Sequence, residues 1–312
     1  MNENKAALIR SLKENSIEFL ENEPLRSYSS IKAGGIADLI IFPRNEKELA
    51  VVASLFNSRS IKFFVTGKGT NTLFKGERTR TPIVSFRKGF KELKELGGRP
   101  ITGGDSAVEL KVGSGVLLSQ VLNYAIKNTL GGCEFFYGIP GSFGGAISMN
   151  AGSKESTIGS IIKGIRILTQ NGEELDIDRK DIEFSYRKLR IKNMKLKFFI
   201  TSSTIRLYRT QRKEIFDKIK IFKERKSSQP LGEYSLGCIF RNPPGIPAGK
   251  IIDEIGLKGL FRGGARISNK HANFIVNPGM ASSSDIMELI RIIQERSMLE
   301  KGIRLRTEIK IV

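Results

Sequence analysis

The segment of residues 138–152 holds five glycines in fifteen residues, together with Ser142 and Asn150. Glycine allows positive φ angles and lets a ligand approach the bare backbone. Backbone N–H groups that stay unpaired in such a turn can donate to an anionic oxygen, such as that of a pyrophosphate. Glycine clusters also mark tight turns between strands, so this segment alone leaves both interpretations open.

A second glycine loop favours the ligand-binding interpretation. Residues 61–65 predict a buried strand that runs directly into residues 66–71, Thr-Gly-Lys-Gly-Thr-Asn. The loop is not a Rossmann fingerprint, because the third glycine is missing and residues 72–74 do not predict a helix. A third small loop, Gly-Ser-Gly at 113–115, follows a predicted strand at 108–112 and can join the same wall.

The rest of the chain predicts alternating helices and strands. Apolar side chains recur at helical spacing in residues 45–57, 117–130 and 284–301. Asn45 and Glu48 predict a capping pair for the first helix. Gly131 and Gly132 predict the end of the second helix. Short β-branched or aromatic runs predict strands at 38–42, 161–168 and 197–200, and a charged helix is expected at 213–226.

The charge distribution bears on possible partners. The chain has 312 residues, 39% of them apolar, and a formal net charge of +20. A strongly basic domain can bind nucleic acid. In this chain, however, the lysines and arginines are spread along the sequence with acidic residues between them. We therefore expect a solvated basic surface and no nucleic-acid partner. The charge can still help to collect phosphate-bearing small molecules.

Localisation and metal binding are constrained by what the sequence lacks. No apolar run approaches the roughly 18 residues of a membrane span, and the N-terminus lacks the pattern of a signal peptide. We expect a cytoplasmic protein that does not associate with a membrane. Cys133, Cys238 and the single histidine, His271, give neither a disulfide framework nor metal-ligand spacing. We therefore expect no metal.

The glycine loops and the motifs after them resemble the UDP-N-acetylenolpyruvoylglucosamine reductase family. The motifs occur in family order at residues 31–38, 67–71, 138–146, 149–152, 184–187, 237–243, 248–252, 256–259, 263–265, 268–274 and 305–308. The resemblance implies an enzyme of peptidoglycan synthesis that contains FAD and uses NADPH to reduce the enolpyruvyl group of a UDP-sugar. The sequence leaves the choice between NADPH and NADH open.

The same resemblance implies an α+β fold with FAD-binding domains of the vanillyl-alcohol-oxidase or PCMH type, plus a smaller C-terminal α+β substrate domain. We predict a first FAD-binding subdomain at 1–91, to which the tail 307–312 returns, a second at 92–211 and the substrate domain at 212–306. Glycine pairs in the polar stretch 92–104 mark the first boundary. The short run from 187 to 238 resembles the compact form of the family. We expect a monomer.

Two residues match charged catalytic positions of the family. Arg187 matches the arginine that contacts the substrate carboxylate, and its guanidinium fork can bond both oxygens. Glu308 matches the glutamate that polarises the developing enol. The alternation of residues 303–309 predicts that Glu308 lies on a strand, opposite the apolar side chains. Without the resemblance, these residues are a surface arginine and the polar side of a strand.

Cys238 departs from the family, whose usual proton donor at this position is a serine. The chain reads Gly-Cys-Ile-Phe at 237–240. A free thiol has a pKa near ~8.5, so it gives up its proton more readily than an alcohol does. An exposed thiol can also be oxidised or alkylated. The alternative is that Cys238 is a small buried side chain and that water supplies the proton.

The resemblance also assigns binding residues. Cofactor contacts fall on Gly67, Gly69, Thr70, Asn71, Gly138, Pro140, Gly141, Ser142, Gly144, Gly145, Asn150 and Gly152. Substrate contacts fall on Lys226, Asn242, His271 and Lys310, each of which is an ordinary surface group when taken alone. Two other functions stay open: an FAD-dependent oxidoreductase of the same fold that acts on a different sugar or hydroxy acid, and a basic binding protein without catalysis.

Overall fold

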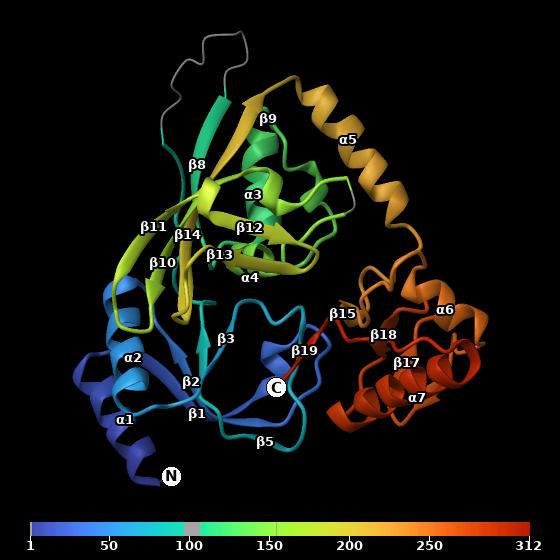
Figure 1. Cartoon of the computed structure of the whole chain (residues 1–312), viewed down its shortest axis with the longest axis horizontal. Helices are drawn as coiled ribbons and strands as arrows, with labels where there is room; N and C mark the ends of the chain where they lie inside the picture. Colours follow the sequence, from blue (N-terminus) through green and yellow to red (C-terminus); the bar gives the residue numbers. More distant parts are fainter. Residues whose placement is uncertain (1, 97–106, 154) are drawn as a thin grey trace. The chain divides into compact units, whose positions relative to one another are not determined.

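The computed structural model describes residues 2–96, 107–153 and 155–312, and the chain divides into two compact units (Figure 1). Unit 1 comprises the chain up to Leu20, Ile40–Lys68 and Ile83–Glu224. Unit 2 comprises Glu21–Leu39, Gly69–Pro82 and Arg225–Val312. The glycine pairs at 97–98 and 103–104, which mark the expected domain boundary, lie outside the described residues.

A six-stranded sheet forms the centre of unit 1 (Figure 1). Its order is β11–β10–β14–β8–β7, and β9 also pairs with β14. The bounds are β7 Leu93–Glu95, β8 Ala107–Gly113, β9 Leu130–Gly131, β10 Ile162–Thr169, β11 Glu174–Asp178 and β14 Phe198–Arg209. The long strand β14 pairs antiparallel with both neighbours, so that Ser202 lies opposite Arg166 on one side and Gly113 on the other.

A second sheet contains the strand that leads into the glycine loop at 66–71. Its order is β1–β2–β6–β3, with β5 paired to β2, and the bounds are β1 Glu18–Pro24, β2 Ile36–Phe42, β3 Phe64–Thr66, β5 Arg78–Thr79 and β6 Ile83–Ser85. β2, β6 and β3 are parallel. The helix α2 (Glu46–Ser58) follows β2, and Oδ1 of Asn45 accepts from the Glu48 N–H at 3.0 Å. The predicted cap is confirmed.

The helices of unit 1 cover an apolar core. They are α1 Asn2–Glu14, α2, α3 Leu118–Lys127 and α4 Phe143–Ser148, and α5 (Arg212–Arg225) follows at the end of the unit. The buried face of α3 packs with apolar side chains of β8 in one cluster. The predicted end of this helix at Gly131 was wrong. The helix stops at Lys127, because Thr129, just after the C-cap Asn128, has a φ angle of 53° and its left-handed backbone cannot continue the helix.

Unit 2 is built on a four-stranded antiparallel sheet with helix α7 packed beside it (Figure 1). The strand order is β15–β18–β17–β16, with bounds β15 Tyr234–Cys238, β16 Phe261–Arg262, β17 Ala265–Ile267 and β18 Phe274–Asn277. The helices are α6 Ala248–Glu254 and α7 Ser283–Lys301. The predicted apolar stripe of α7 is buried, and Gly302 ends the helix with a φ angle of 65°.

The segment after α7 differs from the expectation. A strand was predicted at 303–309, but only Thr307 pairs there, in an isolated bridge with Phe240. The regular strand is β19 (Lys310–Ile311), which pairs in parallel with β4 (Thr72–Leu73). The side-chain amide of Gln294 donates to the carbonyl of Leu305 at 2.9 Å, so a side chain takes the place of a strand partner.

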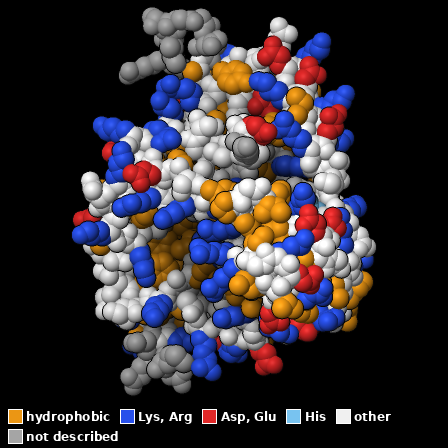
Figure 2. Space-filling view, turned by 45° about the vertical axis from the view of Figure 1, so that its right-hand side comes forward, with side chains coloured by type: hydrophobic (Ala, Val, Ile, Leu, Met, Phe, Trp, Pro, Cys, Tyr) orange, Lys and Arg blue, Asp and Glu red, His pale blue; other side chains and the backbone are white. Residues whose placement is uncertain are grey.

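Short elements complete the chain. The 3-10 helices are η1 Leu25–Tyr28, η2 Glu134–Phe136, η3 Ile158–Ser160 and η4 Arg179–Asp181. The hairpin of unit 1 consists of β12 Ile182–Ser185 and β13 Lys188–Ile191. Figure 2 shows Lys and Arg side chains spread over the visible face with Asp and Glu among them, as the sequence predicted. None of the helices among the described residues has both the length and the apolar character to cross a membrane.

Candidate functional site

The first two glycine loops contact each other in unit 1. Gly67 directly follows β3, and a Cβ atom built on it would lie 1.9 Å from Oγ of Ser142. A non-bonded Cβ does not tolerate that distance, so a side chain at position 67 would push the loops apart. The strand-end loop and the 138–152 segment therefore form one wall.

The third loop, residues 113–115, joins this wall. The N–H of Gly144 donates to the carbonyl of Ser114 at 3.0 Å, and a Cβ on Gly144 would lie 2.6 Å from Cβ of Ser114. Oγ of Ser114 is buried and has no hydrogen-bond partner in the described parts of the chain. A buried hydroxyl without a partner costs free energy unless a ligand supplies one. The sequence showed the loop but not this orphaned hydroxyl.

This wall fits the pyrophosphate of FAD. Gly138 and Gly141 have φ angles of 67° and 140°, which glycine adopts without steric cost. Pro140 lies between them, and Gly145 comes close enough that its Cβ would lie 3.2 Å from Oγ of Ser142. Bare backbone and the buried Ser114 hydroxyl are the groups that a pyrophosphate needs.

Asn150, expected at the flavin, bonds two other backbone segments of unit 1. Its Nδ2 donates to the carbonyl of Ser185 at 3.2 Å, and its Oδ1 accepts from the N–H of Gly159 at 3.1 Å. The residue has a φ angle of 42° and is 8% exposed. Asn150 therefore positions the hairpin of β12 and β13, and its contact with the flavin stays a prediction.

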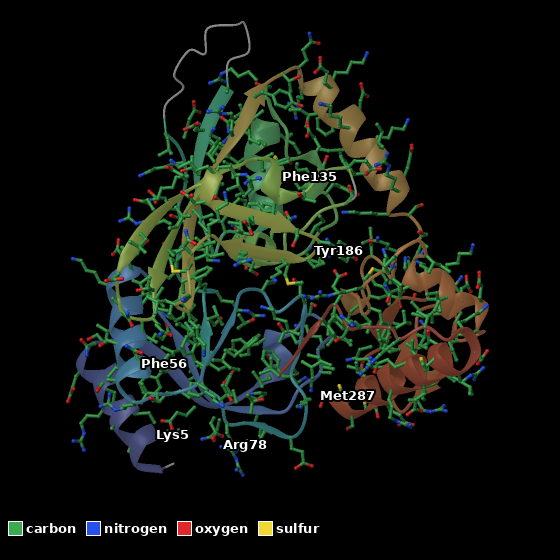
Figure 3. The ribbon with its side chains drawn as sticks, viewed as in Figure 1. Lys5, Phe56, Arg78, Phe135, Tyr186 and Met287 are labelled. Carbon is green, nitrogen blue, oxygen red and sulfur yellow. The ribbon has the colours of Figure 1, made fainter. Side chains whose placement is uncertain are left out.

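Arg187 lies in the two-residue turn of that hairpin, next to Tyr186, which Figure 3 labels. Its φ angle of 57° places the backbone in the left-handed region. The guanidinium lies 5.1 Å from the ring centroid of Tyr186, and Nη1 donates to the carbonyl of Gly152 at 3.4 Å. These contacts restrict a side chain that would otherwise be mobile at a hairpin tip.

The other half of the second glycine loop lies in unit 2 with Gly69, Thr70 and Asn71. The φ angle of Gly69 is 73°, and a Cβ there would lie 1.9 Å from a backbone oxygen. Nδ2 of Asn71 donates to the carbonyl of Glu308 at 3.4 Å, and the Asn71 carbonyl accepts from the N–H of Lys310 at 2.9 Å. The loop is thus bonded to the C-terminal segment.

Cys238 and Glu308 lie on neighbouring segments of unit 2. Cys238 ends β15, is half-buried and forms no disulfide. The N–H of Glu308 donates to the carbonyl of Ile239 at 2.7 Å, and the next pair, Phe240 and Thr307, forms an antiparallel bridge. These backbone bonds fix the thiol-bearing and carboxylate-bearing segments against each other.

Asn273 holds the same segment and was missed in the sequence. Its side-chain amide donates to the carbonyl of Phe240 at 2.8 Å and accepts from the N–H of Phe240 at 2.9 Å. Its own carbonyl accepts from the N–H of Ile239 at 2.8 Å. The residue is only 2% exposed. A polar residue between Ala272 and Phe274 was the available signal, because a buried amide needs partners.

Desolvation lowers the pKa of both lysines expected at the substrate. Lys226 follows α5, and desolvation lowers its pKa to about 8. Lys310 begins β19, opposite Thr72 of β4, and its pKa is also lowered by desolvation. Both lysines belong to unit 2. A lysine whose pKa lies near 8 is partly neutral at slightly alkaline pH, so the mean charge of Lys226 falls as pH rises through about 8.

Asn242 and His271 both have contacts within the fold. Oδ1 of Asn242 accepts from the N–H of Ala248 at 2.9 Å, at the start of α6. Nδ1 of His271 accepts from the N–H of Asn273 at 3.1 Å, so the neutral ring carries its proton on Nε2. Desolvation lowers the pKa of His271 and favours this neutral ring. Their contacts with substrate stay predictions.

Cys133 is not a second candidate acid. It is buried in the core of unit 1, and burial raises the pKa of its thiol. A thiol in such a place stays protonated and inert. Among the described residues, no group of three or more His, Cys, Asp or Glu side chains is arranged to hold a metal ion.

Comparison with known proteins places the chain in a family. The model of the C-terminal domain of UDP-N-acetylenolpyruvoylglucosamine reductase matches residues 229–312, and the model of an FAD binding domain matches residues 37–178. The UDP-N-acetylenolpyruvoylglucosamine reductase of Clostridium tetani is 35% identical over 292 residues, which cover 93% of this chain and 91% of that protein. The chain belongs to the UDP-N-acetylenolpyruvoylglucosamine reductase family.

Solved structures agree with this assignment. The crystal structure of the UDP-N-acetylenolpyruvylglucosamine reductase from Thermus caldophilus has a TM-score of 0.78 and 29% identity, and the match covers 95% of this chain and 98% of that chain. A VAO-type flavoprotein from Myceliophthora thermophila has a TM-score of 0.50 at 12% identity, over 98% of this chain and 63% of that chain. The second likeness concerns the fold alone. The expected FAD-binding fold of the vanillyl-alcohol-oxidase type is confirmed.

Membership of the reductase family settles the class of enzyme. The chain is an FAD-binding oxidoreductase, a UDP-N-acetylmuramate dehydrogenase of peptidoglycan synthesis. Its cofactors are FAD and NADPH. The glycine wall of unit 1 lies within the residues that match the FAD-binding model.

Proposed function

We propose that the chain reduces the enolpyruvyl group of UDP-N-acetylenolpyruvoylglucosamine to give UDP-N-acetylmuramate, with Cys238 as the proton donor. The observation that supports this assignment is the backbone bond between Glu308 and Ile239, which brings the segments of Glu308 and Cys238 together. A reduction of this kind needs an acid and a group that stabilises the developing charge.

FAD, which the glycine wall of unit 1 would hold, would supply a hydride derived from NADPH for the terminal enolpyruvyl carbon. A new C–H bond then forms at that carbon, and the electrons of the C=C bond move to the adjacent carbon, next to the carboxylate. In our proposal, the guanidinium of Arg187 bonds the carboxylate oxygens, and Glu308 polarises the developing enol. The Cys238 thiol gives its proton to the adjacent carbon, and water restores the proton to the thiolate.

Binding of the sugar nucleotide is assigned in the same proposal to Lys226 and Asn242 at the diphosphate. Lys226 carries a charge that depends on pH near 8, whereas Asn242 offers an amide that already caps α6 through its oxygen. His271 and Lys310 are proposed as further polar contacts. An ammonium and an amide N–H are both suitable donors to phosphate oxygens.

The three-domain division and a monomeric state belong to the same proposal. We propose boundaries near residues 92–104 and 210–212, which limited proteolysis of the holoenzyme tests directly. Cleavage confined to other places would contradict the boundaries. Sedimentation of the purified protein tests the monomer.

The direct test of the function is NADPH oxidation by the purified protein with and without UDP-N-acetylenolpyruvoylglucosamine. We expect oxidation to depend on the sugar nucleotide, and the product to be UDP-N-acetylmuramate. A yellow protein that oxidises NADPH without regard to this substrate would keep the flavin and contradict the substrate assignment. Repeating the assay with NADH measures the preference between the two nicotinamides.

A further inference from the structure

Unit 2 contains a pocket of about 520 Å³ that is lined by three arginines. We call it the arginine pocket; its lining residues are Arg241, Gln294, Arg304, Leu305, Arg306 and Thr307. None of them is a residue that we assigned to the flavin, the substrate or catalysis. The inference below therefore does not rest on the proposed reaction.

Backbone bonds hold the walls of the arginine pocket in place. The N–H of Arg241 donates to the carbonyl of Arg306 at 2.9 Å. On the α7 side, the Gln294 amide donates to the carbonyl of Leu305, whose side chain is 1% exposed and anchors the segment in the core. Hydrogen bonds therefore hold the backbone segments that carry the arginines of this pocket.

The positive charge of this pocket is not neutralised within the protein. Arg241, Arg304 and Arg306 are exposed, and none of them forms an ion pair within the described parts of the chain. No Asp or Glu lines the pocket. On helix α7, which contributes Gln294 to the pocket, the arginines are paired instead: Arg291 pairs with Glu295 at 2.8 Å, and Arg296 also has an acidic partner. Like charges that share a pocket repel each other, and an anion bound between them relieves the repulsion.

We propose that the arginine pocket binds a phosphate group, as a second anion site of this enzyme. The planar guanidinium fork matches two phosphate oxygens at once, and several forks around one phosphate give both affinity and orientation. The volume leaves ample room for a phosphate or diphosphate moiety. This site gives part of the +20 net charge a specific role.

The groove beside the pocket suggests where such a phosphate can come from. A groove of about 930 Å³ shares Gln294 and Arg304 with the arginine pocket, and Met298 and Leu299 also line it. Met298 is 56% exposed and Leu299 is 83% exposed. Guanidinium groups beside exposed apolar side chains suit a phosphate that carries an apolar chain, as in a lipid headgroup, and the pocket alone suits a free phosphate. The same chemistry recognises both.

Titration calorimetry of the FAD-loaded protein with inorganic pyrophosphate tests the site. The test variant is Arg304→Gln with Arg306→Gln, and its matched control is Arg262→Gln with Arg291→Gln, which removes the same charge from ion-paired arginines that line neither the pocket nor the groove. We expect the test variant to lose one pyrophosphate site, or to bind at least about tenfold more weakly there, because two charge-assisted forks are removed. The control should keep the site.

Retention of the flavin and an unchanged circular dichroism spectrum show that each variant is folded. Flotation with vesicles of phosphatidylglycerol and phosphatidylcholine, compared with phosphatidylcholine alone, measures the lipid source. The site is assigned to a lipid headgroup if the parent protein binds the anionic vesicles and this binding is lost in two variants. These are the test variant and Met298→Ser with Leu299→Ser. Pyrophosphate binding without vesicle binding assigns it to a free phosphate. The proposal is overturned if the test variant and the control match the parent protein in both measurements.

Discussion

The side-chain amide of Asn150 donates to the carbonyl of Ser185 at 3.2 Å, and thereby ties the glycine-rich segment to the hairpin that carries Arg187. The same side chain accepts from the N–H of Gly159 at 3.1 Å. One buried amide therefore joins its own segment to a residue nine positions along the chain and to another 35 positions along. The proposed flavin wall and the proposed carboxylate-binding arginine depend on a shared support.

We expect Asn150→Ala to weaken both stability and substrate binding. The change leaves a buried N–H and a carbonyl without their side-chain partner, which costs about 1–3 kcal/mol. Alanine also tolerates the φ angle of 42° less well than asparagine does. Urea unfolding should show the loss of stability, and KM for the enolpyruvyl substrate should rise more than the rate of flavin reduction by NADPH falls.

The matched control for this change is Asn193→Ala. Asn193 has a φ angle of 59° and is exposed, and its side chain makes no hydrogen bond in the parts of the chain that are described. Asn193 therefore has the same left-handed backbone as Asn150, but its side chain does not bond other segments of the described chain. An Asn150→Ala protein that is no less stable than the Asn193→Ala protein would contradict the supporting role of Asn150.

The regular elements followed from local patterns in the sequence. The cap of α2 and the apolar stripe of α7 depend on residues three or four positions apart, and both were confirmed. The end of α3 was wrong, because glycines that look like a helix stop at 131–132 belong to β9 and the turn after it. The helix ends earlier instead, at Lys127, where the following Thr129 adopts a left-handed backbone with a φ angle of 53°.

The candidate site depends on contacts that no local pattern contains. The clash between a Cβ at Gly67 and Ser142 joins residues 75 positions apart, and the bond between Glu308 and Ile239 joins residues 69 positions apart (142 − 67 and 308 − 239). The motifs of the resemblance supplied the candidate residues, but they could not show that Asn150 and Asn273 bond backbone. Their roles arise from burial, which depends on the whole fold.

We expect Gly67→Ala to weaken FAD binding. The added Cβ would lie 1.9 Å from Oγ and 2.9 Å from Cβ of Ser142, so the loops must separate. Overpacking of this kind costs about 1–3 kcal/mol, which corresponds to roughly tenfold or more in affinity. Equilibrium dialysis of flavin from the apoprotein measures the change.

A double variant separates steric conflict from other effects at this position. Removing the Ser142 side chain removes the conflict, so Gly67→Ala with Ser142→Gly should bind FAD as well as Ser142→Gly alone. Gly172→Ala is the control for general destabilisation, because Gly172 has a φ angle of 87° and open space around it. If Gly172→Ala loses as much flavin affinity as Gly67→Ala, contact between the loops is not the cause.

We expect Cys238→Ala to stop the second half-reaction and spare the first. NADPH should still reduce the flavin at the parent rate, because that step needs no proton from Cys238. Reoxidation by the enolpyruvyl substrate should slow by about 10²–10⁴-fold, the usual contribution of a general acid. Stopped-flow absorbance separates the two steps.

Cys238→Ser is the control, since a hydroxyl keeps a transferable proton at the same place. We expect it to retain substantial turnover and to lose sensitivity to alkylating reagents, which attack the thiolate. Cys133→Ser should leave both half-reactions unchanged, because Cys133 is buried in the core. If the alanine variant reoxidises as fast as the parent, Cys238 is not the acid.

We expect the affinity for the sugar nucleotide to fall as pH rises through about 8, because Lys226 has its pKa lowered to about 8 by desolvation. Below that pH the ammonium is charged and can bind the diphosphate; above it the free enzyme holds a neutral amine, and affinity falls by up to about tenfold per pH unit. The bound diphosphate raises the pKa of Lys226, so binding above pH 8 should take up a proton, which calorimetry in buffers of different ionisation enthalpy detects.

Lys226→Arg keeps its charge throughout this range and should remove both the pH dependence and the proton uptake. Lys223→Arg, at an exposed position on α5, should change neither. Proton uptake that persists in Lys226→Arg would show that another group titrates.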